Sequence, residues 1–398
     1  MPSPTDIAST LLLVTAGPVL VAAGYLGLLA LLSRRLPAPH HGITERRFDL
    51  VVPAHDEAAG IGATVASLLE LDWPAAQRRV VVVADNCSDD TAARARAAGA
   101  MVLERSDDTL RGKGYALAHA FDRCLADGLA DAVVVVDADT LVSPNLLRAF
   151  AARLDAGASA LQARYKVRNP EASWRTRLMA LAFSLFHDVR SLGRERLGLS
   201  AGLRGNGMCF STRLLRQVPH HAFSVVEDLE YGIRLGLAGH RVGFVDEAWA
   251  SGEMPSGSGA SAMQRRRWEG GRAAMVRRFA GPLLRSGLVR REPVLIDLAL
   301  DLLVPPLSRL VGVAALGSSL ALALALVLGE VPAGAWLWWS SLAALGLYVA
   351  RGCVASGLGL RGVASLAWAP VYLVWRLGAK VAPSTGLVWE RTPREPAP

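Results

Sequence analysis

The sequence contains little cysteine, and its arrangement excludes two common kinds of site. Among 398 residues there are only four cysteines, Cys87, Cys124, Cys209 and Cys353, and no two of them form a Cys-x-x-Cys pair. Such scattered positions give no sign of a zinc site or of a disulfide framework. The simplest interpretation is that all four are reduced thiols on the cytoplasmic side of a membrane.

Two familiar signatures of phosphate and nucleic-acid binding are also missing. No Gly-x-x-x-x-Gly-Lys-Ser/Thr loop is present, which excludes a P-loop protein, and the Gly-Asn-Gly at 205–207 is too short for a dinucleotide fingerprint. The formal net charge is +8, yet no basic stripe with interleaved aromatic residues occurs, so nucleic acid is not an expected partner. Because basic residues flank apolar runs, the charge favours anionic membrane lipids as partners instead.

Charge itself is absent from three long runs. Residues 9–32, 310–329 and 331–350 contain no Asp, Glu, Lys or Arg. About 20 apolar residues cross the hydrocarbon core of a bilayer as a helix, so each run is long enough to span it. The alternative is that these runs form buried core helices of a large soluble protein. Three separate charge-free runs of this length are rare in soluble folds, and we therefore predict transmembrane helices.

Two shorter apolar segments are predicted to lie at the membrane interface. Residues 362–375 are too few to span a bilayer and include Pro370. In residues 294–304, Asp297 and Asp301 are four positions apart and share one helical face. That pattern suits a helix that lies on the membrane surface.

The basic residues beside these runs predict the orientation. Arg34 and Arg35 follow the first run, and Arg351 follows the third, whereas the loop at Glu330 has no nearby Lys or Arg. By the positive-inside rule, the middle section and the C-terminus are cytoplasmic. We therefore expect an integral protein of a bacterial-type inner or plasma membrane. Its predicted parts are a transmembrane helix in 1–35, a cytoplasmic domain in 48–280, interfacial helices with two transmembrane helices in 281–380, and a tail in 381–398.

The middle section alternates between strand and helix patterns. Its strands are continuous β-branched runs, which is typical of strands buried on both faces. Strands that alternate with helices predict an α/β domain with a parallel sheet, in which ligands bind beyond the carboxyl ends of the strands. The predicted strands are 48–55, 80–84, 100–103 and 132–136, and the predicted helices are 58–71, 91–98 and 115–126.

Each of three predicted strand ends carries a polar cluster. The clusters are PAHDE at 53–57, DNCSDDT at 85–91 and DAD at 137–139. All three should meet at one edge of the sheet. For Ser88, Asp89 and Asp90, capping of the following helix is the competing explanation.

Asp137 and Asp139 are explained best by a bound cation. Two carboxylates held a few ångströms apart repel each other, and a divalent cation removes that cost. Oxygen ligands suit Mg²⁺ or Mn²⁺, and two protein carboxylates leave coordination positions for phosphate oxygens. Such a metal bridges a diphosphate and neutralises its charge as it departs. A diphosphate together with a metal suggests a nucleotide.

Three further motifs complete the pattern. RGKG at 111–114 combines flexible glycines with the positive charge of Lys113, although a plain turn is an alternative. VED at 226–228 precedes a predicted helix. QRRRW at 264–268 could be a basic membrane-facing helix, but that explanation does not call for Gln264 or Trp268.

In this order, PAHDE, DNCSDDT, RGKG, DAD, VED and QRRRW resemble the motifs of the membrane-bound family 2 glycosyltransferases. That family includes synthases of cellulose, hyaluronan and poly-N-acetylglucosamine and the ceramide glucosyltransferase-like enzymes. The resemblance covers residues 48–272 and the flanking runs. It implies a GT-A fold, that is, a Rossmann-like α/β domain inserted between transmembrane helices. It also implies a nucleotide-sugar donor, with a UDP-sugar favoured, and inversion at the anomeric carbon.

The resemblance also implies a role for each matching residue. Asp228 matches the general base and Glu227 lies beside it as a second catalytic residue, although Val226 replaces the threonine of the family's Thr-Glu-Asp. Asp139 and Asp137 match the metal-binding pair, with Asp139 as the direct ligand of Mg²⁺ or Mn²⁺. The donor-binding set is Pro53, Glu57, Asp85, Lys113, Asp137, Gln264, Arg267 and Trp268.

The acceptor has two candidate classes at this point. It is a polysaccharide or lipid-linked saccharide, or alternatively a membrane lipid that receives a single sugar. The predicted membrane part is small for a polymer-translocating channel, whereas Q-x-x-R-W occurs in both groups. A catalytically silent scaffold or transporter subunit is the competing class of protein. A scaffold has little reason to keep Asp137, Asp139, Asp228 and Arg267 together.

Overall fold

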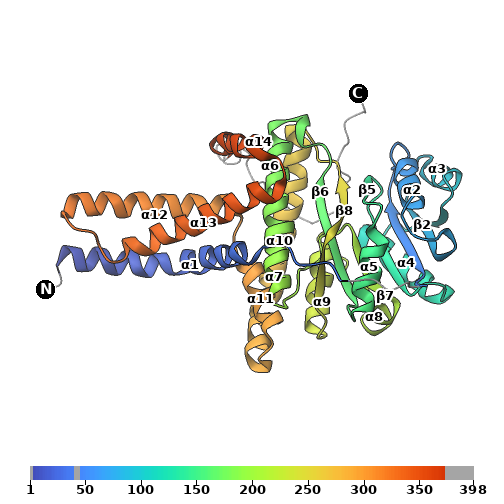
Figure 1. Cartoon of the computed structure of the whole chain (residues 1–398), viewed down its shortest axis with the longest axis horizontal. Coiled ribbons are helices and arrows are strands. Elements are labelled where there is room, and N and C mark those ends of the chain that lie inside the picture. Colours follow the sequence, from blue (N-terminus) through green and yellow to red (C-terminus); the bar gives the residue numbers. More distant parts are fainter. Residues whose placement is uncertain (1–2, 40–44, 373–398) are drawn as a thin grey trace.

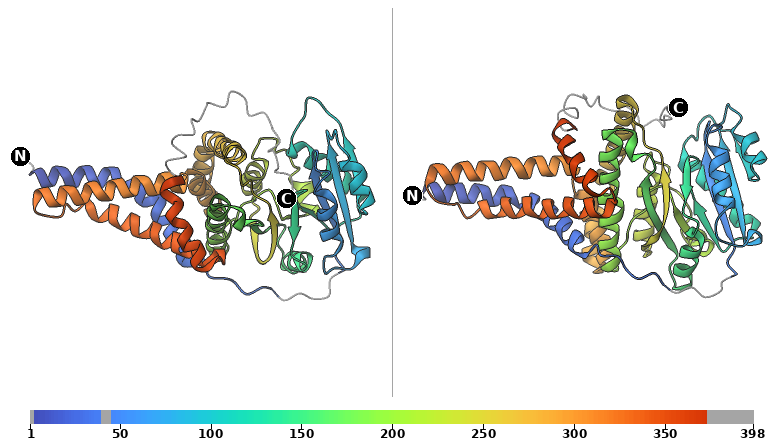
Figure 2. Two further views of the ribbon diagram at one scale, coloured as in Figure 1. Left: turned by 90° about the horizontal axis from the view of Figure 1, so that it is seen from above. Right: turned by 45° about the horizontal axis from the view of Figure 1, so that its top comes forward.

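A computed structural model of the chain describes residues 3–39 and 45–372, and it has two parts (Figure 1). An α/β part contains the sheet, and a bundle of long helices projects from one side of it. Both views in Figure 2 show the same separation. The predicted tail at 381–398 and the end of the 362–375 segment lie outside the described residues.

One mixed sheet holds eight strands in the order β3-β2-β1-β4-β7-β6-β8-β5. The four strands β3, β2, β1 and β4 are parallel, as predicted. β7 is antiparallel to both β4 and β6, and β5 is antiparallel to β8, so the second half departs from the parallel pattern. The strands are β1 (Phe48–Ala54), β2 (Arg78–Asp85), β3 (Met101–Arg105), β4 (Ala132–Val135), β5 (Thr140–Val142), β6 (Ala160–Val167), β7 (Met208–Ser211) and β8 (Val242–Gly252).

Helices cover both faces of the sheet, which explains the continuous apolar strands. Along β1, Leu50 and Val52 join a core with α2, α3 and α5, whereas Val51 joins the opposite core with α4, α8 and α9. Successive side chains of a strand point to opposite faces, so both sets must be apolar. The helices are α2 (Ile61–Leu69), α3 (Thr91–Ala97), α4 (Lys113–Asp127), α5 (Leu146–Asp155), α8 (Thr212–Gln217) and α9 (Glu227–Leu237).

A layer of helices lies between the sheet and the bundle (Figure 1). α6 (Trp174–Phe183) continues through the π-helical turn η3 (Ser184–Val189) into α7 (Arg190–Arg196). α10 (Ser258–Arg290) is a single helix that runs across residue 280, the predicted domain boundary. α11 (Pro293–Leu303) packs against α10.

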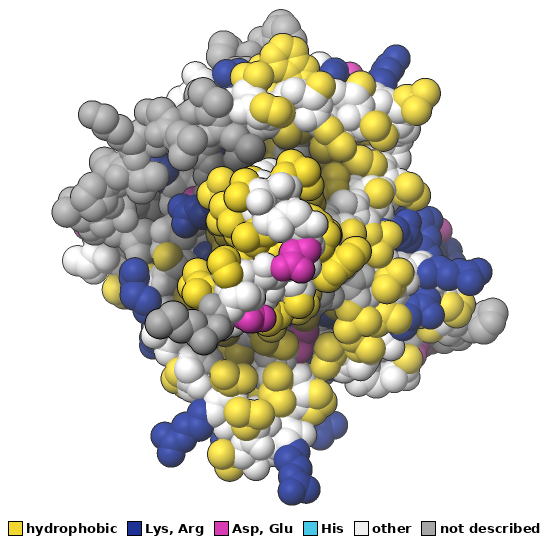
Figure 3. Space-filling model, turned by 90° about the vertical axis from the view of Figure 1, so that its left-hand side faces the viewer, with side chains coloured by type: hydrophobic (Ala, Val, Ile, Leu, Met, Phe, Trp, Pro, Cys, Tyr) yellow, Lys and Arg dark blue, Asp and Glu magenta, His cyan; other side chains and the backbone are white. Residues whose placement is uncertain are grey.

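The bundle consists of α1 (Pro4–Leu32), α12 (Leu307–Leu328) and α13 (Ala335–Ser356), which pack on one another. By length and composition, α1 and α12 are apolar enough to cross a membrane, whereas α13 does not meet that criterion. Exposed side chains such as Val14, Leu316 and Val327 distinguish these helices from the core helices of a soluble domain. Figure 3 looks onto this end, where hydrophobic side chains cover the bundle and Lys and Arg side chains lie around its margin.

The two aspartates of α11 face inward, which the surface-helix interpretation does not explain. Asp297 and Asp301 are each only 4% exposed. Each forms an ion pair with an arginine of α7, at 2.8 Å for Asp297 Oδ2 with Arg194 and 3.1 Å for Asp301 Oδ1 with Arg190. The polar face of this helix is therefore a protein contact. Beyond it, α14 (Gly359–Ser365) and the short turn η4 (Leu366–Trp368) follow α13.

Candidate active site

The strand ends and α10 surround one cavity of about 810 Å³. It lies beyond the carboxyl ends of β1, β2 and β4, where an α/β sheet binds ligands. All of the residues predicted for the site contribute to its wall. They are Pro53, Glu57, Asp85, Lys113, Asp137, Asp139, Glu227, Asp228, Gln264, Arg267 and Trp268.

Lys113 joins two of the predicted motifs. It is the first residue of α4, and its Nζ donates a short hydrogen bond to Asp137 and a 2.6 Å bond to the carbonyl oxygen of Gly205. The same Nζ lies 3.8 Å from Oε1 of Glu227. One ammonium group therefore holds the strand end of β4 and the start of α9 together.

Burial and these charges shift the pKa values of the acidic residues. Burial raises the pKa of Glu227 to about 7, against the opposing charge of Lys113. Burial also raises the pKa of Asp228, although the N–H of Leu229 and the charge of Lys113 both oppose that shift. For Lys113, burial lowers the pKa, but Asp137 and Glu227 outweigh it, so the net shift is upward. The lysine is therefore charged, and Asp228 is more basic than an ordinary aspartate.

The loop before β7, which none of the six motifs includes, forms another wall of the cavity. Gly205 and Gly207 adopt φ angles of +79° and +67°, which other residues rarely adopt. Asn206 between them is fully buried, its Nδ2 donates to Thr140 Oγ1 at 2.6 Å, and its Oδ1 accepts the N–H of Asp137 at 3.2 Å. The Gly-Asn-Gly at 205–207 was too short for a dinucleotide fingerprint, but its two glycines were the available signal of a special turn.

Asp137 and Asp139 supply a donor set that fits a divalent cation. Both carboxylates line the cavity, and oxygen donors are the ligands that Mg²⁺ and Mn²⁺ prefer. Oδ1 of Asp137 accepts from Lys113, so the pair is partly neutralised on that side. Another group with the geometry to hold an ion, Asp56, Cys87 and Asp89, follows β1 and β2.

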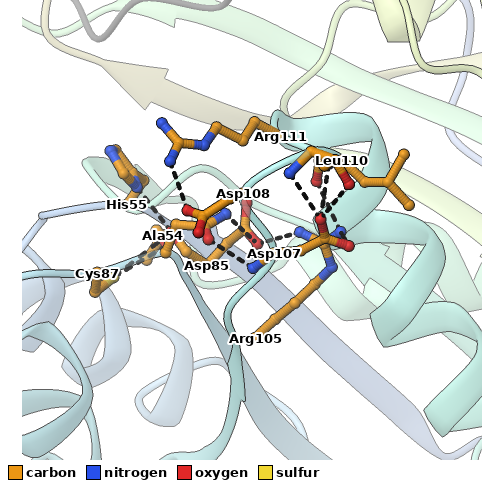
Figure 4. Close-up of polar contacts among 11 residues, drawn as sticks. Ala54, His55, Asp85, Cys87, Arg105, Asp107, Asp108, Leu110 and Arg111 are labelled. Atoms are coloured by element: carbon orange, nitrogen blue, oxygen red, sulfur yellow. Dashed lines mark hydrogen bonds and ion pairs between the residues drawn. The ribbon is translucent and has the colours of Figure 1, made fainter.

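At the end of β2, the carboxylate of Asp85 is fixed by Arg105 of β3 (Figure 4). The Arg105 Nη1 lies 2.6 Å from Asp85 Oδ1, and its Nη2 donates to the carbonyl of Leu110. His55 Nδ1 lies 2.7 Å from the carbonyl oxygen of Asp85. Arg105 was not predicted as a site residue, because no local sequence signal shows that the end of β3 pairs with Asp85.

Asp90 is the N-cap residue of α3 but makes no side-chain capping hydrogen bond, whereas the side chain of Asp89 bonds to the first turn. Its Oδ1 accepts the N–H of Thr91 at the start of α3, and its Oδ2 accepts the N–H of Ala58. Ser88 instead donates its backbone N–H to Asp56 at 2.7 Å. These contacts join the first two strand-end clusters to each other.

The Gln-x-x-Arg-Trp motif lies on α10, and its side chains face the cavity. Trp268 packs with Phe183 and Met254. Oε1 of Gln264 and Nε of Arg267 are buried atoms with no hydrogen-bond partner among the described residues. Both residues line the cavity, where a polar ligand would supply the missing partners.

An α/β sheet whose strand ends carry acidic clusters around one cavity has its ligand site where such sheets bind ligands. The model of the family described as glycosyltransferase-like family 2 matches residues 46–271, which is more than half of the chain. The chain therefore belongs to this family, and it carries a glycosyltransferase domain. The six motifs of the sequence lie inside or beside that range.

Curated relatives agree with the family. The chain is 31% identical over 232 residues to β-monoglucosyldiacylglycerol synthase of Synechocystis sp.. The aligned region covers 56% of this chain and 47% of that protein. It is 23% identical over 263 residues to the probable glycosyltransferase YdaM of Bacillus subtilis, which covers 63% of this chain and 60% of that protein. The chain thus spans about half the length of the curated relatives it matches.

A solved structure supports the fold. The mannosyltransferase PcManGT of Pyrobaculum calidifontis, solved in complex with GDP-Man and Mn²⁺, has a TM-score of 0.53 to this chain at 19% identity. The match covers 87% of this chain and 98% of that one. Together with the family match, it confirms the predicted GT-A fold.

Proposed function

We propose that this protein is an integral membrane glycosyltransferase that transfers a sugar from a nucleotide-diphosphate sugar with inversion at the anomeric carbon. The observation that supports it best is the convergence of all six motifs around one cavity. A UDP-sugar is the favoured donor. Its nucleoside would lie at the strand ends near Pro53, Glu57 and Asp85, and its diphosphate near Lys113, Arg267 and the two aspartates of the third cluster.

Asp139 and Asp137 would hold Mg²⁺ or Mn²⁺, with Asp139 as the direct ligand, as the resemblance to the family implies; Lys113 is bonded to Asp137. When bound, the metal supplies positive charge that stabilises the departing diphosphate. Arg267 adds a guanidinium to the same wall of the cavity, and Gln264 and Trp268 lie beside it. Such fixed donors stabilise charge that develops on the leaving group.

Asp228 is the proposed general base, with Glu227 beside it. Its Oδ1 accepts the N–H of Leu229 at 2.8 Å, which fixes the plane of the carboxylate. As the acceptor oxygen attacks the anomeric carbon, its proton passes to Asp228 and the bond from that carbon to the diphosphate oxygen breaks. A single displacement inverts the configuration and needs no carboxylate nucleophile, unlike the double displacement of retaining enzymes.

For the membrane setting, α1, α12 and α13 are the proposed transmembrane helices, and the α/β part is the proposed cytoplasmic domain. The support is the exposed apolar surface of the bundle and the basic residues beside it. Anionic lipids around the bundle would pair with those basic residues.

The acceptor is a saccharide, free or lipid-linked, or a membrane lipid. One observation favours a lipid-borne acceptor: residues 304–307 before and at the start of α12, and Tyr348 of α13, line the same cavity as the donor motifs. The cavity therefore extends from the strand ends to the base of the bundle.

The direct test is a transfer assay. Purified full-length protein with Mn²⁺ or Mg²⁺ should hydrolyse or transfer sugar from at least one of a panel of UDP- and GDP-sugars, and Asp139→Asn should abolish it. Mass spectrometry of the product separates a polymer from a singly glycosylated lipid. Activity that survives Asp139→Asn undiminished would refute the metal role, and failure to bind any nucleotide sugar would favour a non-catalytic scaffold.

A further inference from the structure

Four arginines from three parts of the chain gather where the cavity meets the helices below the bundle. Among the described residues, the carboxylates that form ion pairs with this group are Asp297 and Asp301 of α11, so four guanidiniums share two paired carboxylates. A buried excess of positive charge is costly unless an anion compensates it. The four are Arg190 and Arg194 of α7, Arg204 of the loop before β7 and Arg272 of α10.

Two of these arginines form ion pairs with the protein, although Nε of Arg194 has no hydrogen-bond partner among the described residues. Arg194 is 1% exposed and pairs with Asp297 at 2.8 Å. Arg190 pairs with Asp301 at 3.1 Å and donates from Nε to the hydroxyl of Tyr348 at 3.0 Å. These contacts join α7, α11 and α13, and they give Asp297 and Asp301 one arginine partner each from α7.

Arg204 differs from Arg190 and Arg194 in its partners. It is 8% exposed, and no carboxylate of the described chain forms an ion pair with it. Its Nη2 donates to the carbonyl of Ala201 at 2.9 Å, while its Nε is buried without a hydrogen-bond partner. Burial lowers the pKa of Arg204 to about 10, which reflects the cost of keeping this charge out of water.

Arg204 and Arg272 both lie near one aromatic ring. The guanidinium carbons of Arg204 and Arg272 are 4.1 Å and 5.9 Å from the ring centre of Phe186, which belongs to the π-helical turn η3. Within the described residues, Arg272 also lacks an ion pair and donates to the carbonyls of Asp301 and Val304. All three side chains line the cavity.

The chain beside Arg204 lies next to the proposed base, and the charge of Arg204 acts on the pKa of Asp228. A Cβ atom at Gly205, the next residue, would be only 3.3 Å from Oδ2 of Asp228. In the other direction, Arg272 contacts the backbone of Val304, where the segment leading into α12 begins. The two arginines therefore lie between Asp228 and the start of α12 in the bundle.

We propose that Arg204 and Arg272 form an anion subsite for the acceptor, which binds the phosphate of a lipid headgroup while a hydroxyl of that headgroup reaches Asp228. This inference rests on the proposed function, because it assigns the acceptor's chemical class to the same cavity. Guanidinium groups bind phosphate through paired hydrogen bonds, and two of them match its charge and shape. The apolar lining at 304–307 suits the acyl end of such a lipid.

The test measures binding to purified full-length protein in a neutral detergent, by calorimetry. The probes are dioctanoyl phosphatidylglycerol, dioctanoylglycerol and inorganic phosphate. The wild type should bind the phospholipid more tightly than either other probe. Arg204→Gln and Arg272→Gln should each weaken phospholipid binding at least about tenfold, because each removes a charge-assisted hydrogen bond. Arg285→Gln is the matched control, since Arg285 is an exposed arginine of α10, and it should bind as the wild type does.

Several results would overturn the inference. Equal affinity for dioctanoylglycerol would mean that the phosphate is not recognised, and equal affinity for inorganic phosphate would mean that the lipid is not. Unchanged phospholipid binding in both arginine variants would exclude these residues. If Arg204→Gln proves unstable, Arg272→Gln gives the same answer.

A second titration with UDP and Mn²⁺ separates this inference from the proposed function. Arg204→Gln should bind UDP as the wild type does. A parallel loss of UDP binding would assign the arginines to the donor diphosphate and overturn the inference. If the wild type binds no nucleotide while phospholipid binding still depends on Arg204, the proposed function fails and the anion subsite stands.

Discussion

The two ends of the cavity carry opposite charge. At the strand ends, the ammonium of Lys113 lies beside the carboxylates of Asp137 and Glu227, and Asp139 lines the same wall. Below the bundle, four guanidiniums surround two carboxylates. An acidic end suits the proposed cation with its diphosphate, and a basic end suits the proposed anion.

This difference shows where selection of each substrate would take place. The acidic end is built on the sheet, whose strand ends hold the carboxylates rigidly. The basic end is built from helices that also contact the bundle, so it combines charge recognition with an apolar surface. Asp228 lies between the two ends, where a donor and an acceptor would meet.

Removing the proposed base should have the largest effect. Asp228→Asn keeps the shape of the side chain but cannot accept the acceptor's proton, and general-base groups typically contribute about 10²–10⁴-fold to a rate. Sugar transfer at saturating donor should fall by that factor, while UDP affinity changes little. A loss of UDP affinity that matches the loss in rate would contradict this role.

Neutralising the lysine at the acidic end should come next. Lys113→Met removes the charge that holds Asp137 and Glu227 together, so their carboxylates repel each other. We expect donor affinity to fall about 10- to 100-fold, measured by calorimetry with UDP and Mn²⁺. The control is Arg123→Met on the exposed face of the same helix, which should bind UDP normally.

The pH profile can show that the two ends influence each other. Asp228 acts in its ionised form, so transfer is lost as the pH falls through its pKa, which burial raises. Arg204 lowers that pKa, and its removal should therefore move the acidic limb of the rate profile to higher pH. Measuring rate against pH for wild type and Arg204→Gln checks this. An unmoved limb would mean that the ends are electrostatically independent.

A packing change should give the smallest and most local effect. A Cβ at Gly114 would lie 2.2 Å from the carbonyl oxygen of Ala222, so Gly114→Ala forces the start of α4 away from its neighbour. Overpacking of this kind costs about 1–3 kcal/mol of unfolding free energy. Gly62→Ala in α2, where nothing lies within 4 Å, should be neutral or slightly stabilising. Chemical denaturation of both variants measures the difference.

The acidic end could be predicted from the sequence, and the basic end could not. Continuous valines that end on Asp85 or Asp137 identify buried parallel strands, and the strand-end rule then brings the clusters together. Arg190 and Asp301, by contrast, are 111 residues apart, and no local pattern connects them. The spacing of Asp297 and Asp301 correctly put them on one helical face, but it could not say that this face is buried.

The antiparallel strands were missed for a related reason. β7 has four residues, Met208–Ser211, and unlike the equally short valine run of β4 it contains no β-branched residue that would identify a strand. The turn at Gly205 and Gly207 that precedes it carries the contacts to Lys113 and Asp137. Its two glycines were visible in the sequence, but their positions relative to the acidic end depend on β7 pairing with β4.

The measurement that tests the central claim most directly is UDP binding with and without Mn²⁺ in wild type and in Asp139→Asn. The account predicts that Mn²⁺ strengthens UDP binding to the wild type at least about tenfold, because the metal links the diphosphate to Asp139. Asp139→Asn should lose that gain, while Asp72→Asn, a surface aspartate that pairs with Arg148, should keep it. Equal UDP affinity with and without the metal, or an undiminished gain in Asp139→Asn, would contradict the account.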